Sequence, residues 1–351
     1  MKPALAVAIF GNFMATNFIE ATTDVSRLDG EGWWAVTHTF EGEFQAFRFE
    51  GLQPIDLEIL VELGHDLTHV AIPHSDWSSS LSQAAYVDAV EGIRQDIARG
   101  WVYQANLCRV LSAPLTQDVN VVALWNLLAK HNPAPFLSAL QVPASVSGLE
   151  TDVRIVSASP ELFLSRNQQT LRTSPIKGTA RIADELLEKD QTENIMIVDL
   201  VRNDLGQVCE SGSVKVVDLL RLEHHPGLVH LVSDVEGTLP KDTGWSQILA
   251  AMYPPGSVSG APKSSALEVI HRLENGPRGI YCGGFGWVDA DAKTAELAVG
   301  IRTFWQGYNS GAKSLHFGTG AGITWASDPT GEWHETELKA QRLLSIAAVT
   351  L

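Results

Sequence analysis

Strand and helix signals are interspersed along this chain without the regular strand–helix–strand alternation that builds a parallel sheet. Short apolar segments between glycines predict strands at Tyr281–Val288 and Thr294–Trp305. Apolar residues at helical spacing predict helices at Ser82–Gly100 and Val121–His131. An irregular mixture of this kind favours an α+β fold over a doubly wound sheet.

No linker-like segment divides the 351 residues. We therefore expect a single domain spanning 1–351, with a strand-rich part at 1–75 and a larger core at 80–348. The apolar run from Ala4 to Phe10 is short for the core of a signal peptide and predicts a first β-strand. No segment is long enough to predict a membrane-spanning helix, so no membrane partner is expected.

The charge balance limits the partners that the chain can bind. Lys and Arg total 25 and Asp and Glu total 41, which gives a net charge of −16. That excess of acid argues against broad binding to nucleic acid or anionic membranes, but a few local cations can still bind an anionic substrate. Cys108, Cys209 and Cys282 lack the spacing of a metal site or disulfide framework, which predicts reduced thiols and a cytoplasmic location.

Lys177 lies in the most constrained local sequence of the chain, Pro175-Ile176-Lys177-Gly178-Thr179. Pro175 fixes the backbone before it, and Gly178 permits a sharp turn or a close approach to a ligand after it. We therefore expect Lys177 on a constrained loop, neither on a helix nor inside a strand, with its amine presented as a functional group. The alternative is an ordinary surface lysine in a turn.

Two pairs of acidic residues have a spacing of three on predicted helices. Asp190 and Glu193 form the first pair, and Glu332 and Glu335 form the second, so each pair lies on one helix face. If the two faces meet, four carboxylates need a cation between them, and oxygen ligands favour Mg²⁺. The alternative, which the spacing alone favours, is a pair of solvated helix faces.

A glycine-rich segment from Gly256 to Lys263 opens a predicted helix, and a helix N-terminus is a ready anion site. Ala261 and Pro262 separate the second glycine from the lysine, so the spacing does not match a Walker A phosphate loop. Elsewhere, His230 lies between apolar neighbours, a context typical of a satisfied core histidine.

Several separated motifs are similar to those of one enzyme family. They are Ser159-Pro160-Glu161, Asp190-Gln191-Thr192-Glu193-Asn194 with the following Ile197 to Asp204, Gly260-Ala261-Pro262-Lys263, Ile301-Arg302-Thr303 and His334-Glu335-Thr336. Over most of its length the chain resembles the chorismate-utilising enzymes, and within that family the component I subunits of aminodeoxychorismate synthase. The resemblance implies an α+β fold in which two large β-sheets pack against each other and are flanked by helices.

The resemblance also implies roles for individual residues. Glu193 and Glu335 match the family's Mg²⁺ ligands, and Asp190 and Glu332 stand where the family often has supporting acids. Arg302 matches an arginine that binds a carboxylate of chorismate. The other residues that the resemblance places in the substrate pocket are Tyr281, His230, Ser259 and Gly260.

Two further contacts follow from the residues themselves. Lys339 lies four residues after Glu335 on the same predicted helix face, so it can reach the same ligand. Gly320-Ala321-Gly322 can offer unobstructed backbone N–H groups to an anion.

The implied reaction replaces the C4 hydroxyl of chorismate with an amine. Glu161 matches the family's general acid/base and would protonate the leaving hydroxyl. Lys177 stands where aminodeoxychorismate synthases carry lysine and anthranilate synthases typically carry alanine. As a neutral amine it would add at C2, and ammonia would then add at C4 and expel it; direct attack of ammonia at C4 is the other route. Gln104 stands where isochorismate and salicylate synthases carry a lysine base, which favours amine transfer over addition of water.

The expected activity is therefore that of aminodeoxychorismate synthase component I, which makes 4-amino-4-deoxychorismate for para-aminobenzoate and folate biosynthesis. No glutaminase-like segment is found, so we expect a separate glutamine amidotransferase subunit to supply ammonia. No lyase-like segment is found either, so the pyruvate side chain should stay on the product. The main alternative is anthranilate synthase component I. A non-catalytic homologue ranks below it, and a metal hydrolase ranks last.

Overall fold

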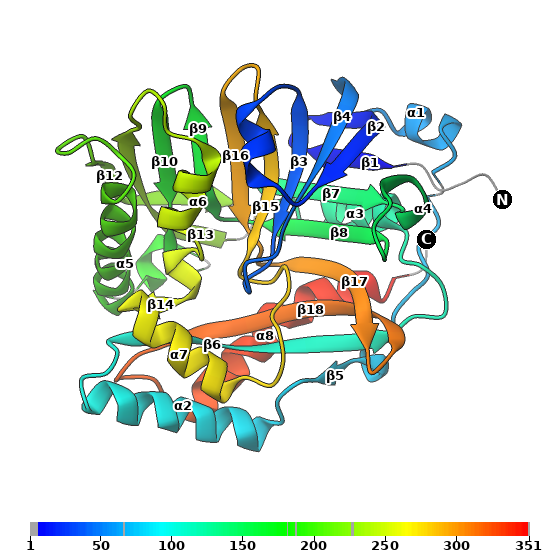
Figure 1. Cartoon of the computed structure of the whole chain (residues 1–351). Helices are drawn as coiled ribbons and strands as arrows, with labels where there is room; N and C mark the ends of the chain where they lie inside the picture. The colour runs from blue at the N-terminus through cyan, green and yellow to red at the C-terminus, as the bar shows by residue number, and fades with distance from the viewer. Residues whose placement is uncertain (1–5, 66, 181, 187, 226–227, 350–351) are drawn as a thin grey trace.

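Hydrogen bonds between strands join most of the molecule into one long ladder (Figure 1). The computed structural model describes residues 6–65, 67–180, 182–186, 188–225 and 228–349. Within them the strands are β1 (Val7–Phe10), β2 (Phe13–Thr22), β3 (Trp33–His38), β4 (Phe44–Pro54), β5 (Ser78–Ser79), β6 (Gln104–Pro114), β7 (Phe136–Val142), β8 (Val153–Ser159), β9 (Leu162–Asn167), β10 (Thr170–Ser174), β11 (Ile176–Ala180), β12 (Lys215–His225), β13 (Leu228–Thr238), β14 (Gly260–Ala261), β15 (Gly284–Asp289), β16 (Thr294–Val299), β17 (Thr303–Asn309) and β18 (Ala312–Ile323). The α-helices are α1 (Leu57–Glu62), α2 (Gln83–Ala98), α3 (Val121–His131), α4 (Ala144–Ser147), α5 (Glu188–Gly206), α6 (Trp245–Met252), α7 (Lys263–Leu273) and α8 (Pro329–Ala347).

The strand pairings give the ladder the order β12–β13–β10–β9–β16–β15–β3–β4–β2–β1–β7–β8–β17–β18–β6. Strand β11 pairs with β13 next to β10, and β5 and β14 pair with β6. All of these pairings are antiparallel. In Figure 1 the strands β10, β16 and β3 stand upright, whereas β8, β17, β18 and β6 run across the view. The ladder therefore bends between its two halves.

Apolar side chains of the two halves face each other across a shared core. Trp33, Phe47 and Phe285 come from one half and Leu140 and Ile155 from the other, and all are buried in one cluster. The expected pair of packed sheets is thus confirmed, with the difference that hydrogen bonds through β2, β1 and β7 join the two sheets. Three further cores lie where α5 and α6 cover the first half, where α3 and α8 cover the second, and where α2 and α7 pack on β6.

The predicted helices are present, and the predicted strands differ mainly near the C-terminal third. Helix α2 begins after Ser82, whose hydroxyl accepts a hydrogen bond from the N–H of Ala85 (3.2 Å) as an N-cap residue does. The single strand predicted for Thr294–Trp305 is wrong, because Arg302 has a φ of 55° and separates β16 from β17. Strand β15 begins later than predicted and leaves Tyr281 in the turn before it.

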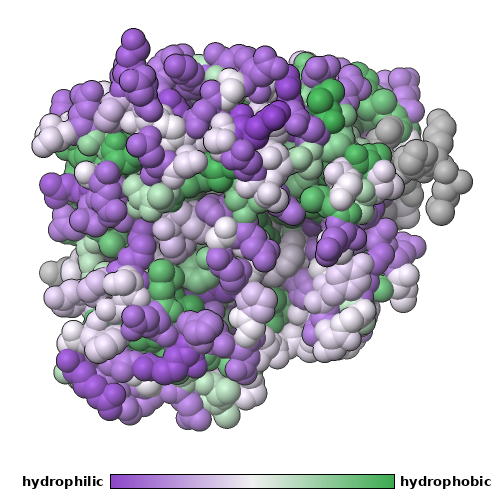
Figure 2. Space-filling view, viewed as in Figure 1, coloured by the Kyte–Doolittle hydropathy of each residue, from purple (hydrophilic) through white to green (hydrophobic). Residues whose placement is uncertain are grey.

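The surface agrees with the charge balance of the sequence. Figure 2 shows one face on which hydrophilic residues predominate and hydrophobic residues appear in scattered patches. No helix within the described ranges combines the length and the apolar composition that crossing a membrane requires.

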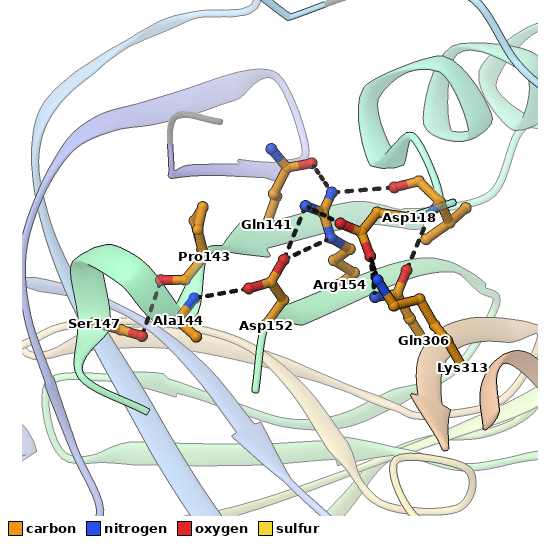
Figure 3. A network of polar contacts seen from close by, with 10 residues as sticks. Asp118, Gln141, Pro143, Ala144, Ser147, Asp152, Arg154, Gln306 and Lys313 are labelled. Carbon is orange, nitrogen blue, oxygen red and sulfur yellow. Dashed lines mark hydrogen bonds and ion pairs between the residues drawn. The ribbon is translucent and has the colours of Figure 1, made fainter. Parts of the chain in front are cut away.

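A polar network around Arg154 fastens the second half of the ladder to the segment before α3 (Figure 3). The buried Arg154 guanidinium donates to Oε1 of Gln141 (2.8 Å) and to the carboxylate of Asp152 (3.0 Å). Asp118 in turn forms an ion pair with Lys313 of β18. All three nitrogens of the Arg154 guanidinium therefore have hydrogen-bond partners, which is the condition for placing a charge inside a sheet.

A second buried cation, Arg278, connects segments that are far apart in the sequence. Its guanidinium pairs with Glu274 (2.6 Å) and donates to the carbonyls of Asn106 (2.7 Å) and Val258 (3.0 Å). Glu274 also accepts a hydrogen bond from the N–H of Cys108 (2.8 Å). The side chains of Arg278 and Glu274 are 2% and 8% exposed, so the large desolvation cost of this ion pair has to be offset by all of these contacts together.

Replacing Arg278 with methionine is expected to lower the free energy of unfolding by about 3–5 kcal/mol, because Glu274 becomes a buried charge without a cation. Urea unfolding followed by circular dichroism measures this. The matched control is Arg27→Met, which removes an exposed pair with Glu20 and should change stability by less than about 1 kcal/mol. Equal losses in the two variants would contradict the central role of the Arg278 pair.

Candidate functional site

Lys177 lies inside strand β11, so the prediction of a loop is wrong. The strand is irregular, however, because the register of its pairing with β13 shifts between Ile176 and Thr179. Gly178 lies in this irregular stretch with a φ of 88°, and a Cβ at that position would come within 2.8 Å of Cβ of Asp190. The proline and glycine of the motif therefore mark a bulged strand packed tightly against α5.

The two ends of the ladder approach each other at Lys177. Strand β11 belongs to one end, and Gln104 on β6 belongs to the other. A Cβ built on Gly322 of β18 would lie 3.3 Å from Nζ of Lys177 and would overlap the amide nitrogen of Gln104. The side chains of Lys177 on β11 and Gln104 on β6 therefore both lie next to Gly322, although the two strands do not pair with each other.

Burial lowers the pKa of Lys177, and the positive charge of Lys339 lowers it further. The groups that oppose this shift are the carboxylates of Glu193, Glu161 and Glu335. A lowered pKa increases the neutral fraction of a lysine, and the neutral amine is the nucleophilic form. The amine therefore lies among acids from α5, from α8 and from the residue before β9.

Gln104 leaves a hydrogen-bond acceptor at this site. The residue is 1% exposed, and its side-chain oxygen has no partner within the described part of the chain. The position is fixed by β14, in which Ala261 pairs with Gln104 and Gly260 pairs with Ala105. Gly260 has a φ of 146°, and a Cβ there would overlap the carbonyl oxygen of Gln104. Gly260 therefore permits the close approach of β14 to β6.

Glu161 is buried immediately before β9. Its Oε1 accepts a hydrogen bond from the N–H of Ile176 (3.4 Å). Burial raises the pKa of Glu161, although a hydrogen bond from Ser257 and the charge of Lys177 oppose the shift. A carboxylic acid with a raised pKa near a lysine with a lowered pKa is an arrangement suited to proton transfer.

Gly320 and Gly322 present backbone groups at an open edge of β18. Pairing with β17 ends before these residues, whereas pairing with β6 continues past them. Opposite them on β6, the N–H groups of Cys108 and Asn106 bond to groups outside β18. The two glycines therefore occupy non-hydrogen-bonded pairs and direct their own N–H and C=O groups away from β6. On that side the Gly320 carbonyl accepts a hydrogen bond from Nζ of Lys339 (3.0 Å).

Three of the four predicted metal ligands interact electrostatically with one another. Burial raises the pKa of Glu332, and the negative charges of Glu335 and Glu193 raise it too, against a hydrogen bond from Ser327 and the charge of Lys339. Lys339 also forms an ion pair with Glu335 (2.6 Å). The helices α5 and α8 thus bring their acids toward a common point. The fourth residue, Asp190, packs against Gly178.

The fit of these four acids to a metal ion depends on their spacing and on their donor atoms. Within the described residues, no three acidic, histidine or cysteine side chains converge closely enough to form a metal site as they stand. Their donors are all carboxylate oxygens, which suit a hard cation such as Mg²⁺ and not a soft one. The raised pKa of Glu332 beside two other carboxylates is the electrostatic strain that such a cation relieves. The acids therefore fit Mg²⁺ in their chemistry.

Arg302 and Tyr281 lie on the α8 and β18 side of the site. Nη1 of Arg302 donates to the backbone carbonyl of Lys339 (3.0 Å). Tyr281 is buried against β18, where a Cβ on Gly318 would overlap its ring. Burial raises the pKa of Tyr281, so its hydroxyl stays protonated.

Three other predicted residues lie deeper in the framework. Ser259 is fully buried and donates to the carbonyl of Pro255 (3.1 Å). His230 is buried on β13 opposite Thr179 of β11. Ala321 alternates with its two glycine neighbours and is buried on β18 in its pairing with β6. Their proposed contacts with a ligand stay predictions.

Sequence reasoning assigned no role to a buried ion pair close to Glu161. Nζ of Lys263 lies 2.7 Å from Oδ2 of Asp204 and also donates to the carbonyl of Met252 (3.3 Å). The lysine at the start of α7 is therefore committed to a carboxylate, which argues against an anion site at this helix end. The only signal in the sequence was that both residues belong to the motifs quoted above.

A family model described as chorismate binding enzyme matches residues 55–345. The chain belongs to this family. It is therefore related to enzymes that act on chorismate, and the residues gathered around Lys177 lie within the matched region.

Individual relatives carry two different names. The chain is 34% identical over 321 residues to anthranilate synthase component 1 1 of Haloarcula marismortui, covering 87% of this chain and 63% of that protein. It is 32% identical over 334 residues to aminodeoxychorismate synthase component 1 of Bacillus subtilis, covering 90% and 68%. A solved structure of anthranilate synthase component I from Streptococcus pneumoniae has a TM-score of 0.71 at 25% identity, covering 97% of this chain and 81% of that one. The chain thus spans less than two thirds of the length of its anthranilate synthase relative from Haloarcula.

Reaction of Lys177 with acetic anhydride tests the electrostatics of the site. The rate, followed by peptide mass spectrometry, is expected to rise with a midpoint below the ordinary lysine pKa of about 10.4, because burial disfavours the ammonium. A synthetic peptide of residues 173–180 has the same local sequence without the burial and is the control. Identical midpoints for the protein and the peptide would contradict the lowered pKa.

Proposed function

We propose that this chain is the chorismate-aminating component of an aminodeoxychorismate synthase, which replaces the C4 hydroxyl of chorismate with an amine. The product is 4-amino-4-deoxychorismate, a precursor in para-aminobenzoate and folate biosynthesis. The observation that carries the proposal is the position of Lys177, whose amine of lowered pKa lies beside Gln104 and among the acids of α5 and α8. An enzyme that adds ammonia directly at C2 has no use for a nucleophilic lysine at this point.

The reaction then proceeds through two displacements. The Lys177 amine forms a bond to C2 while the double bonds shift and the C4–O bond breaks. Glu161 donates a proton to the departing hydroxyl, which leaves as water. Ammonia forms a bond to C4, the C2–N bond breaks, and the product leaves with its new amine as an ammonium group. Glu161 is then a carboxylate that has to be protonated again before the next turnover. The sequence requires a neutral Lys177 and a protonated Glu161 at its start, and the directions of their pKa shifts favour both states.

Chorismate has two carboxylates, and the site contains cationic and N–H groups as well as a group of acids. One carboxylate would be bound by Arg302, Lys339 and the backbone N–H groups of Gly320 and Gly322. The ring of chorismate would be surrounded by Tyr281, His230, Ser259, Gly260, Ala321 and Gln104. Glu193 and Glu335, supported by Asp190 and Glu332, would hold Mg²⁺, which supplies positive charge for the other carboxylate. Gln104 offers its unpaired oxygen to a donor such as the incoming ammonia.

A separate glutamine amidotransferase subunit would release the ammonia in the cytoplasm. Support for a second subunit comes from relatives whose names include "component 1". High concentrations of free ammonia should replace this partner in an assay, because the partner contributes ammonia and no group to the site.

Anthranilate synthase component I is the second candidate, since relatives of comparable similarity carry that name. In that case ammonia would add at C2, and Lys177 would form no bond to the substrate. The two functions share the fold, the acids and the substrate, so product identity separates them.

Incubation of the purified chain with chorismate, Mg²⁺ and ammonium at mildly alkaline pH is expected to give 4-amino-4-deoxychorismate, identified by chromatography and mass spectrometry. Lys177→Ala should lower the rate roughly 100-fold or more, because it removes the nucleophile, while chorismate affinity is retained. Lys177→Arg is the size-matched control that keeps a charge but cannot act as a neutral amine. Formation of anthranilate, or full activity of Lys177→Ala, would exclude the proposed route.

Glu335→Gln is expected to raise the Mg²⁺ concentration for half-maximal activity roughly 10–100-fold, because the variant loses a charged oxygen ligand. Calorimetric titration with Mg²⁺ gives the same comparison without turnover. Glu337→Gln, two residues along α8 and paired instead with Arg109, is the matched control. An unchanged Mg²⁺ titration for Glu335→Gln would remove this residue from the metal site.

A further inference from the structure

A small cavity next to Glu161 has about 10 Å³ of space open to the centre of a water molecule. Its lining includes Ser257, Thr173, Gly256 and Asp204 of α5. This volume is about what one water molecule needs, and a buried water needs two to four polar partners. The carboxyls of Glu161 and Asp204, with the two hydroxyls, can provide them.

The cavity connects Glu161 to a buried ion pair that reaches toward solvent. The side chain of Asp204 is 3% exposed and that of its partner Lys263 is 18% exposed. Burial raises the pKa of Asp204, although the charge and hydrogen bond of Lys263 oppose the shift. The charged group that acts on Glu161 is Lys177, and the charged group that acts on Asp204 is Lys263. A continuous path therefore runs from solvent through Lys263, Asp204 and the cavity to Glu161.

Gly256 keeps this space open. A Cβ at that position would lie 2.9 Å from Cδ2 of Leu200 and 3.5 Å from Oδ2 of Asp204. Its φ is not in the left-handed region, so alanine is compatible with the backbone there. A side chain at position 256 would therefore collide with its neighbours. Gly256→Ala narrows the cavity without removing a charge.

We propose that Lys263, Asp204 and one water in this cavity form a relay that carries protons between solvent and Glu161. The relay rests on the proposed role of Glu161 as the acid of the reaction. Glu161 is 4% exposed, so a substrate in front of it leaves this path for proton exchange. Lys263 passes a proton to the Asp204 carboxylate, Asp204 passes a proton to the cavity water, the water protonates the Glu161 carboxylate, and solvent reprotonates Lys263. Only O–H and N–H bonds change, and one proton enters from solvent.

The kinetic test uses Asp204→Asn, Lys263→Met and Gly256→Ala in the ammonia-dependent reaction. Each is expected to lower kcat about tenfold or more, as loss of proton transfer does, while KM for chorismate is unchanged. The rate of each variant should then rise with imidazole concentration at constant pH, whereas the wild-type rate should not. Lys263→Arg keeps the cation but cannot give up a proton, so its rate should stay low and depend on imidazole like that of Lys263→Met. Asp118→Asn disrupts an Asp–Lys pair remote from the cavity and should behave like the wild type.

If Asp204→Asn or Lys263→Met prevents folding, Gly256→Ala still tests the relay, because it leaves the charges of Asp204 and Lys263 in place. A wild-type kcat in this variant, or a reduced kcat that does not respond to imidazole, would overturn the relay. The relay can also be tested without turnover by infrared spectroscopy. The carboxylic acid band of Glu161, assigned with Glu161→Gln, should exchange hydrogen for deuterium about tenfold more slowly in Gly256→Ala than in the wild type. Equal exchange rates reject the relay, whereas absence of product from the wild-type protein rejects the proposed function and leaves the exchange result standing.

Discussion

The buried ion pair between Arg278 and Glu274 is the contact on which the geometry of the site depends. It binds the backbone carbonyls of Asn106 and Val258. Gln104, two residues before Asn106, supplies the amide near Lys177, and Ser257, next to Val258, supplies a hydroxyl that bonds to Glu161. A buried pair of this kind is stable only while every charge and carbonyl keeps its partner. The pair therefore sets the position of β6 relative to the glycine-rich segment before α7, and a small movement of either strand would cost several contacts at once.

The bend of the ladder explains why the site forms between segments that do not pair. Strands β11 and β6 lie near opposite ends of the strand order, yet Lys177 and Gln104 meet above Gly322. The two ends approach without hydrogen bonding to each other, and on β18 Gly320 and Gly322 direct their N–H groups away from β6. Glycines at 260 and 322 make the approach possible, because a side chain at either position would overlap Gln104. The gap between β11 and β6 therefore exists because the ladder curves back on itself but, within the described residues, forms no hydrogen bonds between its two ends.

Local patterns in the sequence predicted the helices well, because helix periodicity and capping by residues such as Ser82 depend on near neighbours. The α+β class and the identity of the residues around Lys177 also followed from the sequence and its resemblance to known enzymes. The placement of Lys177 in a bulged strand did not, since its pairing partner on β13 is some fifty residues away in the chain. The break at Arg302 and the pair between Asp204 and Lys263 were missed for the same physical reason: both depend on tertiary contacts that no local pattern records.

Lys177 and Glu161 illustrate how burial selects the reactive protonation states. Each charge favours ionisation of the other, which alone would give an ammonium and a carboxylate that can neither attack nor protonate a substrate. Burial is the larger influence on both, and it lowers the pKa of Lys177 while it raises the pKa of Glu161. A ligand that expels water from the gap increases the cost of both charges. Substrate binding should therefore move the pair toward a neutral amine and a neutral acid, so that the groups become reactive when there is something for them to act on.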